Sequence, residues 1–473
     1  MKPRRRPPAV LRAAGLLLAA SLATEPADRA VAADGETLPP DLRARTDGID
    51  WPAFLGPNRD SKSPETGIRT DWAGGLPLLW HLELGEGYAA PSVARGRLFY
   101  FTRYRDRARL VAVRAENGKE LWRSEYPTDY EDYYGYDGGP RTAPLIDGPR
   151  VYSVGADGFL RCHRIVDGAV LWERDVHADY GVQQNFFGVA SSPWIEGDLL
   201  IVAVGGSPPG APNIHSGRVK SNGTALVALD KRTGEERYRV GDDLASYASP
   251  IVIDFDGRRL GFHFARSGLI VFDPKAGQEL DRFDWRARRL TSVNAANPVI
   301  VGNQVLLTES YEKGAVLLEY EAASDGDGGA FRSIWQDGSR NQSIAAHWNT
   351  PVYHEGVVYV SSGEKSPNAE LRAVDWATGE IHWSHPRLAR TQLLYVDDHF
   401  VVHSEVGDLL LIRATPESYQ QVAHIRLRAE VDGRTVDLLR YPAWAAPVLS
   451  HGVLYVRGRS RLAALELIPP PAP

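Results

Sequence analysis

A pattern of apolar strands recurs along most of the chain, each time in two halves. The opening half is a small residue and a proline, then an apolar residue, a glycine and an apolar-aromatic run, as in Ala90-Pro91-Ser92-Val93 followed by Gly96 to Tyr100. The closing half is Leu-x-small, a glycine eight residues after the leucine, and an aromatic residue four after the glycine. Leu-x-Ala alternation buries one face of a strand, and an Asn-Gly or Thr-Gly pair supplies the positive φ of a tight hairpin turn. The pattern predicts a series of short antiparallel strands.

The opening half occurs eight times, at steps of 42 to 57 residues, which is the length of one four-stranded propeller blade with its loops. The copies begin at Ala90, Ala143, Ser192, Ser249, Asn297, Thr350, Leu393 and Ala446, and the copy at Leu393 lacks the proline. The aromatic residue of the closing half is expected to fill the wedge between neighbouring blades. With the strand around Trp80, these structural aromatics are Trp80, Trp122, Trp172, Tyr238 and Trp383, whereas the fourth copy has Asp281 in that place.

The two ends of the repeat series complement each other. The last copy reaches Leu462 to Leu465 but ends before a glycine and tryptophan can follow, and Leu78 to Leu82 is a tryptophan strand with no preceding blade. Joining the two predicts an all-β, eight-bladed propeller with four antiparallel strands per blade, closed by the N-terminal strand. Such closure removes the exposed edges of an open sheet. A linear solenoid or two separate β-domains would leave the strand of Trp80 unexplained.

The N-terminal residues indicate export. Lys2 and Arg4 to Arg6 precede an apolar stretch at 13–23, which is typical of a signal peptide and too short to span a bilayer; a retained anchor is the alternative. We expect a signal peptide and leader at 1–32, an extended segment at 33–75, the propeller at 76–467 and a tail at 468–473. The expected location is periplasmic or extracellular, without an integral membrane segment after cleavage. The net charge of −6 is spread along the chain, which argues against a nucleic-acid partner, and we expect a monomer.

The repeat resembles that of the quinoprotein-type propeller family, on the elements Gly118-Lys119-Glu120-Leu121-Trp122 and Gly379-Glu380-Ile381-His382-Trp383. That family includes eight-bladed dehydrogenases that use pyrroloquinoline quinone (PQQ) and the propeller of the outer-membrane β-barrel assembly machine. The segment Trp51 to Asp60 is similar to one that precedes many secreted propellers of planctomycete-type bacteria. The resemblance covers roughly residues 76 to 467 and implies the fold, while the repeat itself encodes packing rather than chemistry.

Few residues suggest catalysis. The chain has no Cys-Cys pair and no Cys-x-x-Cys-His, so a vicinal disulfide over a quinone and covalent haem are excluded. Its single cysteine, Cys162, takes the small position of Leu-x-Ala and is expected to be buried and inert. Glu309, Asn294 and Asn297 are weighed as calcium ligands but are expected to be turn formers, and the run 325–329 is expected to be an insertion rather than a calcium loop. We therefore assign no catalytic or metal-binding residue.

Loops that precede the inner strands are expected to line one mouth of the central channel. The candidate ligand-binding residues at this rim are Arg141, Asn185, Tyr247, Asn294 and Asn349, although hydrogen bonding to neighbouring blades is an alternative role for them. Two function hypotheses follow. The first is a non-catalytic binding or scaffold module for a protein or polysaccharide partner, without a cofactor. The second is a disulfide-free alcohol or sugar oxidoreductase that uses PQQ and calcium.

Overall fold

The computed structural model describes residues 36–183, 186–213, 218–255, 257–323 and 328–471. The expected signal peptide at 1–32, the candidate Asn185 and residues 325–327 of the glycine-aspartate run lie outside this part of the chain. The chain divides into two units, Met1–Leu38 and Pro39–Pro473, and the description below concerns the second. Among the described residues, no helix has the length and apolar character that crossing a membrane would require.

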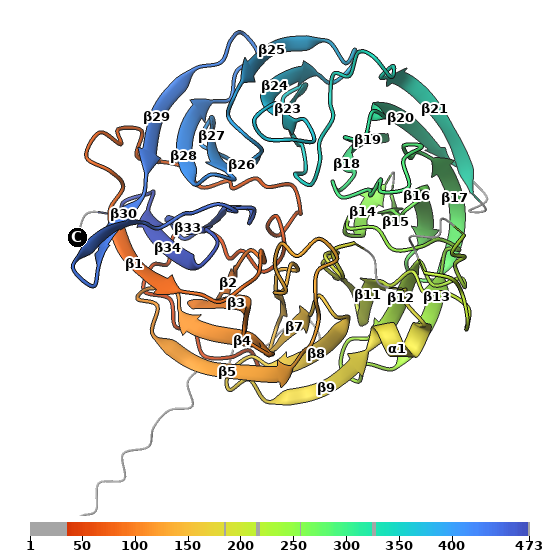
Figure 1. Ribbon diagram of the computed structural model, residues 1–473, viewed down its shortest axis with the longest axis horizontal. Helices are drawn as coiled ribbons and strands as arrows, with labels where there is room; N and C mark the ends of the chain where they lie inside the picture. Colours follow the sequence, from red (N-terminus) through yellow and green to blue (C-terminus); the bar gives the residue numbers. More distant parts are fainter. Residues whose placement is uncertain (1–35, 184–185, 214–217, 256, 324–327, 472–473) are drawn as a thin grey trace, which may run out of the picture. The chain divides into compact units, whose positions relative to one another are not determined.

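Eight four-stranded antiparallel sheets form a ring around a common centre (Figure 1). Blade one consists of β2 (Ser92–Ala94), β3 (Arg97–Tyr104), β4 (Arg107–Arg114) and β5 (Glu120–Pro127), and blade two of β6 (Leu145–Asp147), β7 (Arg150–Val154), β8 (Phe159–Arg164) and β9 (Val170–Asp175). Blade three consists of β10 (Trp194–Glu196), β11 (Leu199–Ala203), β12 (Leu226–Asp230) and β13 (Glu236–Val240), and blade four of β14 (Ile251–Phe255), β15 (Arg258–Phe264), β16 (Gly268–Asp273) and β17 (Gln278–Asp284). Blade five consists of β18 (Val299–Val301), β19 (Gln304–Glu309), β20 (Gly314–Ala322) and β21 (Gly329–Gln336), and blade six of β22 (Val352–His354), β23 (Val357–Ser362), β24 (Glu370–Asp375) and β25 (Ile381–Pro386). Blade seven consists of β26 (Thr391–Val396), β27 (His399–Ser404), β28 (Asp408–Arg413) and β29 (Gln421–Arg426). The predicted all-β, eight-bladed propeller is confirmed.

Blade eight joins the two ends of the strand series. It consists of β32 (Val448–Ser450), β33 (Val453–Arg457) and β34 (Arg461–Glu466), and its outer strand is β1 (Leu78–Glu83). Trp80 pairs with Ala464 and Leu82 with Leu462, so the N-terminal strand closes the ring as predicted. Outside the blades lie a hairpin, β30 (Arg428–Val431) and β31 (Arg434–Asp437), and a short helix, α1 (Val176–Tyr180), which Asp175 caps.

In six of the eight blades, an aromatic residue of the outer strand packs against the hairpin turn of the next blade. The indole nitrogen of Trp122 in β5 donates to the carbonyl of Ile165 at 2.9 Å, and the ring lies against Gly168. A Cβ on Gly168 would come within 2.4 Å of the indole, and its φ of +73° also favours glycine. The same contact to a carbonyl of the next blade is made by Trp80, Trp172, Tyr238, Trp335 and Trp383. These rings therefore join the blades as well as fill the space between them.

Two seams between blades differ from this pattern. Between blades four and five, Asp281 accepts a hydrogen bond from the hydroxyl of Tyr320 at 2.7 Å. Between blades seven and eight, Ala423 of β29 stands in the aromatic position. There the N-terminal segment supplies Trp72, which is 3% exposed, belongs to the hydrophobic cluster of these two blades and lines the same groove as Ala423. The seam without its own aromatic residue is thus covered by a residue from before β1.

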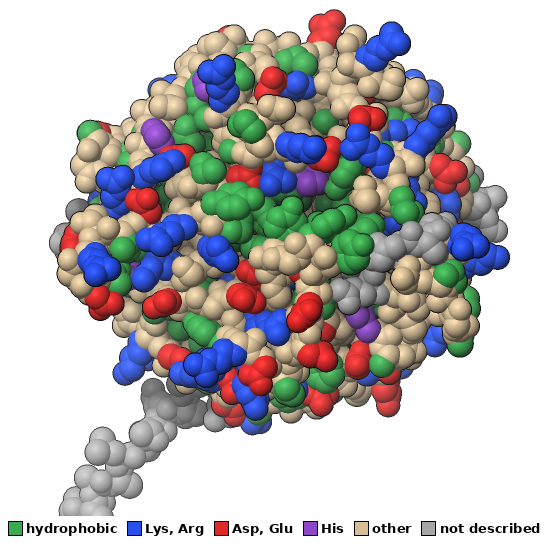
Figure 2. Space-filling view, viewed as in Figure 1, with side chains coloured by type: hydrophobic (Ala, Val, Ile, Leu, Met, Phe, Trp, Pro, Cys, Tyr) green, Lys and Arg blue, Asp and Glu red, His purple; other side chains and the backbone are tan. Residues whose placement is uncertain are grey.

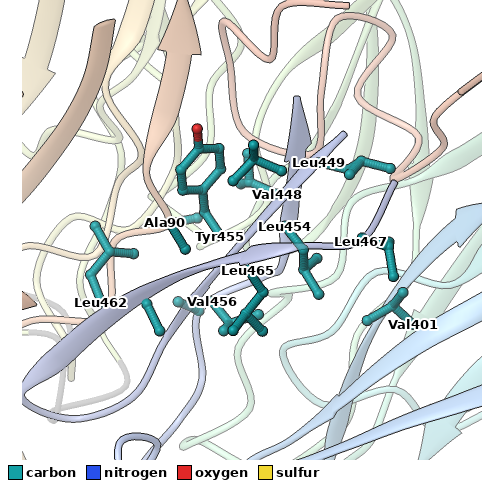
Figure 3. Close-up of a cluster of buried hydrophobic side chains, with 14 of the residues drawn as sticks. Ala90, Val401, Val448, Leu449, Leu454, Tyr455, Val456, Leu462, Leu465 and Leu467 are labelled. Atoms are coloured by element: carbon teal, nitrogen blue, oxygen red, sulfur yellow. The ribbon is translucent and has the colours of Figure 1, made fainter. Parts of the chain in front are cut away.

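The hydrophobic core is divided among the spaces between adjacent blades. Side chains of β33 and β34 extend to both sides of blade eight, where Val401 lies beside Leu467 and Ala90 beside Tyr455 (Figure 3). In blade two, Cys162 is fully buried and pairs with Trp172 across the strands. The small side chain leaves room beside the large ring, which supports a packing role for the thiol.

Candidate functional site

The loops before the inner strands meet around a cavity of about 220 Å³ at one mouth of the central channel. Each of the eight blades contributes one residue from the same repeat position, three residues before the proline of the opening half or before its equivalent, Leu393. We call these residues the mouth ring: Tyr88, Arg141, Ala190, Tyr247, Ala295, Trp348, Arg390 and Trp444. The cavity wall is completed by residues beside them and by Phe54. A single repeat position therefore forms a shared site from the whole chain.

The position within the repeat decides which of the candidate rim residues line the cavity. Arg141 and Tyr247 belong to the mouth ring, and the hydroxyl of Tyr247 accepts a hydrogen bond from the backbone N–H of Phe187 at 2.8 Å. Asn294 and Asn349 do not line the cavity, because each is displaced from the ring position by one residue. Both asparagines are buried, and their amides donate to backbone carbonyls, Asn294 to Ala265 at 2.7 Å and Asn349 to Ser361 at 2.9 Å.

Arg141 is held by its own loop. Its guanidinium forms an ion pair with the buried Asp132 at 2.7 Å and donates to the carbonyls of Asp137 and Gly139. It also lies over the rings of Tyr88 and Tyr130, at 5.6 and 5.4 Å from their centroids. Because the charge is neutralised within the loop, Arg141 orders the segment before blade two and is not a free cation for an anionic ligand.

A second arginine, Arg390, organises the opposite part of the wall. It binds Glu405 through two nitrogens, with Nη2 2.7 Å from Oε2, and Glu405 also accepts the indole N–H of Trp444 at 2.9 Å. Burial opposes ionisation of Glu405, but the hydrogen bonds and charge of Arg390 outweigh it, so the pKa of this carboxyl is lowered. Arg390 is therefore neutralised as well.

The same arginine determines the state of a neighbouring histidine. Arg390 Nη1 donates to His347 Nδ1 at 2.9 Å, and His347 Nε2 lies 2.9 Å from the hydroxyl of Tyr311. Burial and the charge of Arg390 lower the pKa of His347 to about 3, so the ring is neutral. Since Nδ1 must accept from arginine, the proton lies on Nε2 and is donated to Tyr311. No nitrogen of His347 remains to act as a base.

Aromatic rings form most of the cavity wall. The ring centroids of Tyr88 and Trp444 are 4.6 Å apart, and those of Trp348 and Trp444 are 6.0 Å apart. Arg390 lies over both indoles, and Tyr136 extends the aromatic surface outward from Trp444 with 53% of its area exposed. Figure 2 shows hydrophobic side chains gathered over the centre of the ring on one face, with charged side chains around them.

The N-terminal segment also contributes to the cavity wall. Trp51 pairs with Val93 of blade one through two backbone hydrogen bonds of 2.8 Å, and the carbonyl of Pro52 accepts from Ile146 of blade two. Further along, Arg59 donates to the carbonyl of Pro193 in blade three at 2.7 Å. Between these contacts Phe54 reaches the cavity wall. The segment from Trp51 to Asp60 is therefore tied to blades one to three, and Phe54 is its contribution to the cavity wall.

Sequence reasoning missed most of the wall: Phe54, Tyr88, His347, Trp348, Arg390 and Trp444. A signal for four of them was present, since Tyr88, Trp348, Arg390 and Trp444 stand at the same repeat position as Arg141 and Tyr247. The roles of Phe54 and His347 depend on the path of the leader and on contacts between blades, which a single repeat unit does not contain.

The donor set of the cavity does not fit a calcium-bound quinone. Calcium requires several oxygen ligands, usually with carboxylates among them, and none of the described residues that line the cavity is an aspartate or a glutamate. The buried Glu309 instead accepts hydrogen bonds from Ser292 and from the backbone of Ala287. Asn297 accepts from the backbone of Ser249 at 2.7 Å. Among the described residues, no cluster of three or more histidine, cysteine or acidic side chains could hold a metal ion.

The family profile described as outer membrane protein assembly factor BamB matches residues 69–221 and 203–384, which together span more than half of the chain. The chain belongs to this family. Within it, the repeat is the quinoprotein-type propeller repeat, as the sequence analysis inferred. No curated protein sequence matches the chain significantly.

The chain is similar to several solved structures. BamB from Moraxella catarrhalis is 13% identical, with a TM-score of 0.55 over 83% of this chain and 97% of that one. The computationally designed Ika8 protein is 11% identical, with a TM-score of 0.51 over 83% of this chain and 100% of that one. The quinohemoprotein alcohol dehydrogenase from Comamonas testosteroni is 13% identical, with a TM-score of 0.48 over 90% of this chain and 81% of that one. The likeness to BamB and to Ika8 shows the fold alone, because the identities are low.

Proposed function

We propose that this protein is an exported, non-catalytic propeller that binds a protein partner at the channel mouth. The carrying observation is the mouth ring, in which all eight blades contribute to one small aromatic cavity. Aromatic residues and arginine are the side chains most enriched at the energetic centres of protein interfaces. Export is supported by the signal-like sequence at 1–32, and the periplasm or the cell exterior is the proposed location.

The chemistry of the wall supports binding rather than catalysis. The arginines and the histidine at the wall are already engaged: Arg141 with Asp132, Arg390 with Glu405, and His347 with Arg390 and Tyr311. General acid–base catalysis needs a group that can exchange a proton with a substrate near neutral pH. The neutral, fully engaged His347 does not meet that requirement, and the cavity wall, as far as the structure describes it, contains no carboxylate.

Site-specific crosslinking in the native cell tests this proposal. A photo-reactive residue in place of Tyr136 should give a discrete adduct with one protein. Ala190→Trp, which fills the cavity, should abolish the adduct, whereas Ala276→Trp on an exposed turn of blade four should leave it unchanged. An adduct that is indifferent to Ala190→Trp would contradict the proposed site, and adducts with polysaccharide alone would contradict the protein partner.

A cofactor assay tests the enzymatic alternative. The purified protein is mixed with PQQ and Ca²⁺, and dye-linked oxidation of alcohols and sugars is measured. We expect no turnover. Oxidation that Ala190→Trp abolishes and Ala276→Trp preserves would overturn the binding proposal in favour of an oxidoreductase.

A further inference from the structure

Two hydrogen-bond donors in the wall of the mouth cavity have no partner among the described residues. They are the hydroxyl of Tyr88 and the indole nitrogen of Trp348, and both atoms are buried. Burial raises the pKa of Tyr88 well above its usual range, so this hydroxyl keeps its proton and can donate. Buried polar groups in proteins are nearly always satisfied, and an unsatisfied one calls for a specific explanation. A ligand with acceptor atoms would supply that explanation.

Side-chain acceptors are scarce in the same wall. The described part of the wall has no carboxylate, His347 Nδ1 already accepts from Arg390, and the hydroxyl of Tyr247 already accepts from Phe187. Apart from tyrosine hydroxyls, the side-chain acceptor that remains among the described wall residues is the amide oxygen of Gln392, whose nitrogen donates to the carbonyl of Trp444. A ligand that brought many N–H or O–H groups would therefore leave them unpaired, at a cost for each one.

We infer that the mouth cavity binds a proline-containing, extended segment of the partner, with one proline ring between the aromatic side chains. This inference rests on the proposed protein-binding function. Proline is the residue without a backbone N–H, and in the polyproline II conformation the carbonyls are not used internally and can accept. Such segments dock in aromatic-lined grooves elsewhere in proteins. The donors of Tyr88 and Trp348 complement the carbonyls, and the rings of Trp348 and Trp444 complement the flat pyrrolidine.

The size of the site and its surroundings agree with this ligand. A cavity of about 220 Å³ is smaller than the pockets that enclose whole drug-sized molecules, roughly 300–1,000 Å³, so it suits one ring of a longer chain. Tyr134, Tyr136 and Tyr441, which are 48–53% exposed, continue the aromatic surface beyond the cavity. A sugar fits less well, because every hydroxyl brings a donor that needs an acceptor.

Calorimetric titration of the full protein with a blocked ten-residue polyproline peptide tests the inference. Binding is expected, and none is expected with a Gly-Ser peptide of equal length. Tyr88→Phe and Trp348→Phe each remove one donor while keeping an aromatic ring, and each should weaken binding about three- to tenfold, as for the loss of one hydrogen bond. Tyr419→Phe removes a hydroxyl near the outer strand of blade seven and should not change the affinity. Thermal melting of every variant verifies that the fold is retained.

The possible outcomes separate this inference from the proposed function. Absence of peptide binding, or binding that Tyr88→Phe and Trp348→Phe leave unchanged, would overturn the proline ligand even if the protein adduct at position 136 persists. Binding of maltohexaose or cellohexaose in place of the peptide would also overturn it. By contrast, a crosslinked adduct that still forms in Ala190→Trp would contradict the proposed function itself.

Discussion

Trp444 donates its indole N–H to Glu405 Oε2 at 2.9 Å, which joins the loop before blade eight to a turn of blade seven. The same carboxylate binds Arg390, and its side chain is fully buried. One acidic residue thus holds two members of the mouth ring in place. Its contribution to stability and to the shape of the site can be measured separately.

Glu405→Gln should lower the free energy of unfolding by about 3–5 kcal/mol, because it leaves the buried guanidinium of Arg390 without a counter-charge. Urea denaturation at neutral pH gives this value. The matched control is Glu312→Gln, which alters an exposed ion pair with Arg289 and should change the stability by less than about 1 kcal/mol. Equal effects of the two variants would show that Glu405 is solvated.

Trp122→Ala and Trp383→Ala should each cost about 3–5 kcal/mol, because each removes a large buried ring and a hydrogen bond to the next blade. Asn341→Ala, on an exposed loop, should change the stability by less than about 0.5 kcal/mol. Thermal melting compares the three variants. Similar melting temperatures for all of them would contradict the packing of these tryptophans between blades.

Removal of the N-terminal strand should open the ring. A variant that lacks residues 1–84 loses β1, leaves the edge of β34 unpaired, and should aggregate. A variant that lacks residues 1–38 keeps the whole second unit and should remain monomeric in size-exclusion chromatography. The boundary matters, since Arg45 pairs with Glu466 and Asp50 with His451, so removal of residues 1–50 should already reduce stability. A monomeric, stable 85–473 fragment would refute closure by β1.

Acid should destabilise the propeller before its carboxylates are titrated. Burial lowers the pKa of His163 and His403 to about 4 and that of His263 and His347 to about 3. In the unfolded chain these groups titrate near pH 6.5. The unfolded state therefore binds more protons below that pH, and the stability is full above about pH 6.5 and falls as the pH drops toward about 4.

Each of these histidines should contribute a loss of up to about 1.4 kcal/mol per pH unit within that window. Urea unfolding at a series of pH values measures the slope. His403→Gln should reduce the slope, whereas His382→Gln, on the exposed outer strand of blade six, should leave it nearly unchanged. A slope that neither variant alters would assign the acid sensitivity to other groups.

The blades could be predicted from the sequence because their signals are local. The leucine, glycine and tryptophan of a hairpin lie within one turn and the two strands beside it. Their spacing can therefore be recognised within a single repeat. Trp335 was not predicted as a structural aromatic, although its indole N–H donates to the carbonyl of Trp376 in the next blade. The hairpin between β20 and β21 is longer than in the other blades, so the spacing of the motif differs there. Trp72 was not predicted either, because it lies outside the repeat.

The site was harder to predict because it depends on orientation. Arg141 and Tyr247 stand at the repeat position that lines the cavity, whereas Asn294 and Asn349 are each one residue away from that position. A shift of one residue turns a side chain from the cavity toward the neighbouring backbone, where both amides are bound. Proximity to the start of an inner strand therefore does not predict which side chains line the cavity. The number of residues before the proline does.

Pairing of β1 with β34 also constrains how the molecule folds. Leu82 and Leu462 are partners, although nearly the whole propeller sequence separates them. Contacts of such long range require the closure of a very large loop, which makes their formation slow. Seven blades can assemble from neighbouring segments as the chain emerges, but the eighth waits for the last strand to be synthesised. The early-made strand β1 is thus expected to reach its final place late, and until then the edge of β34 stays accessible to chaperones.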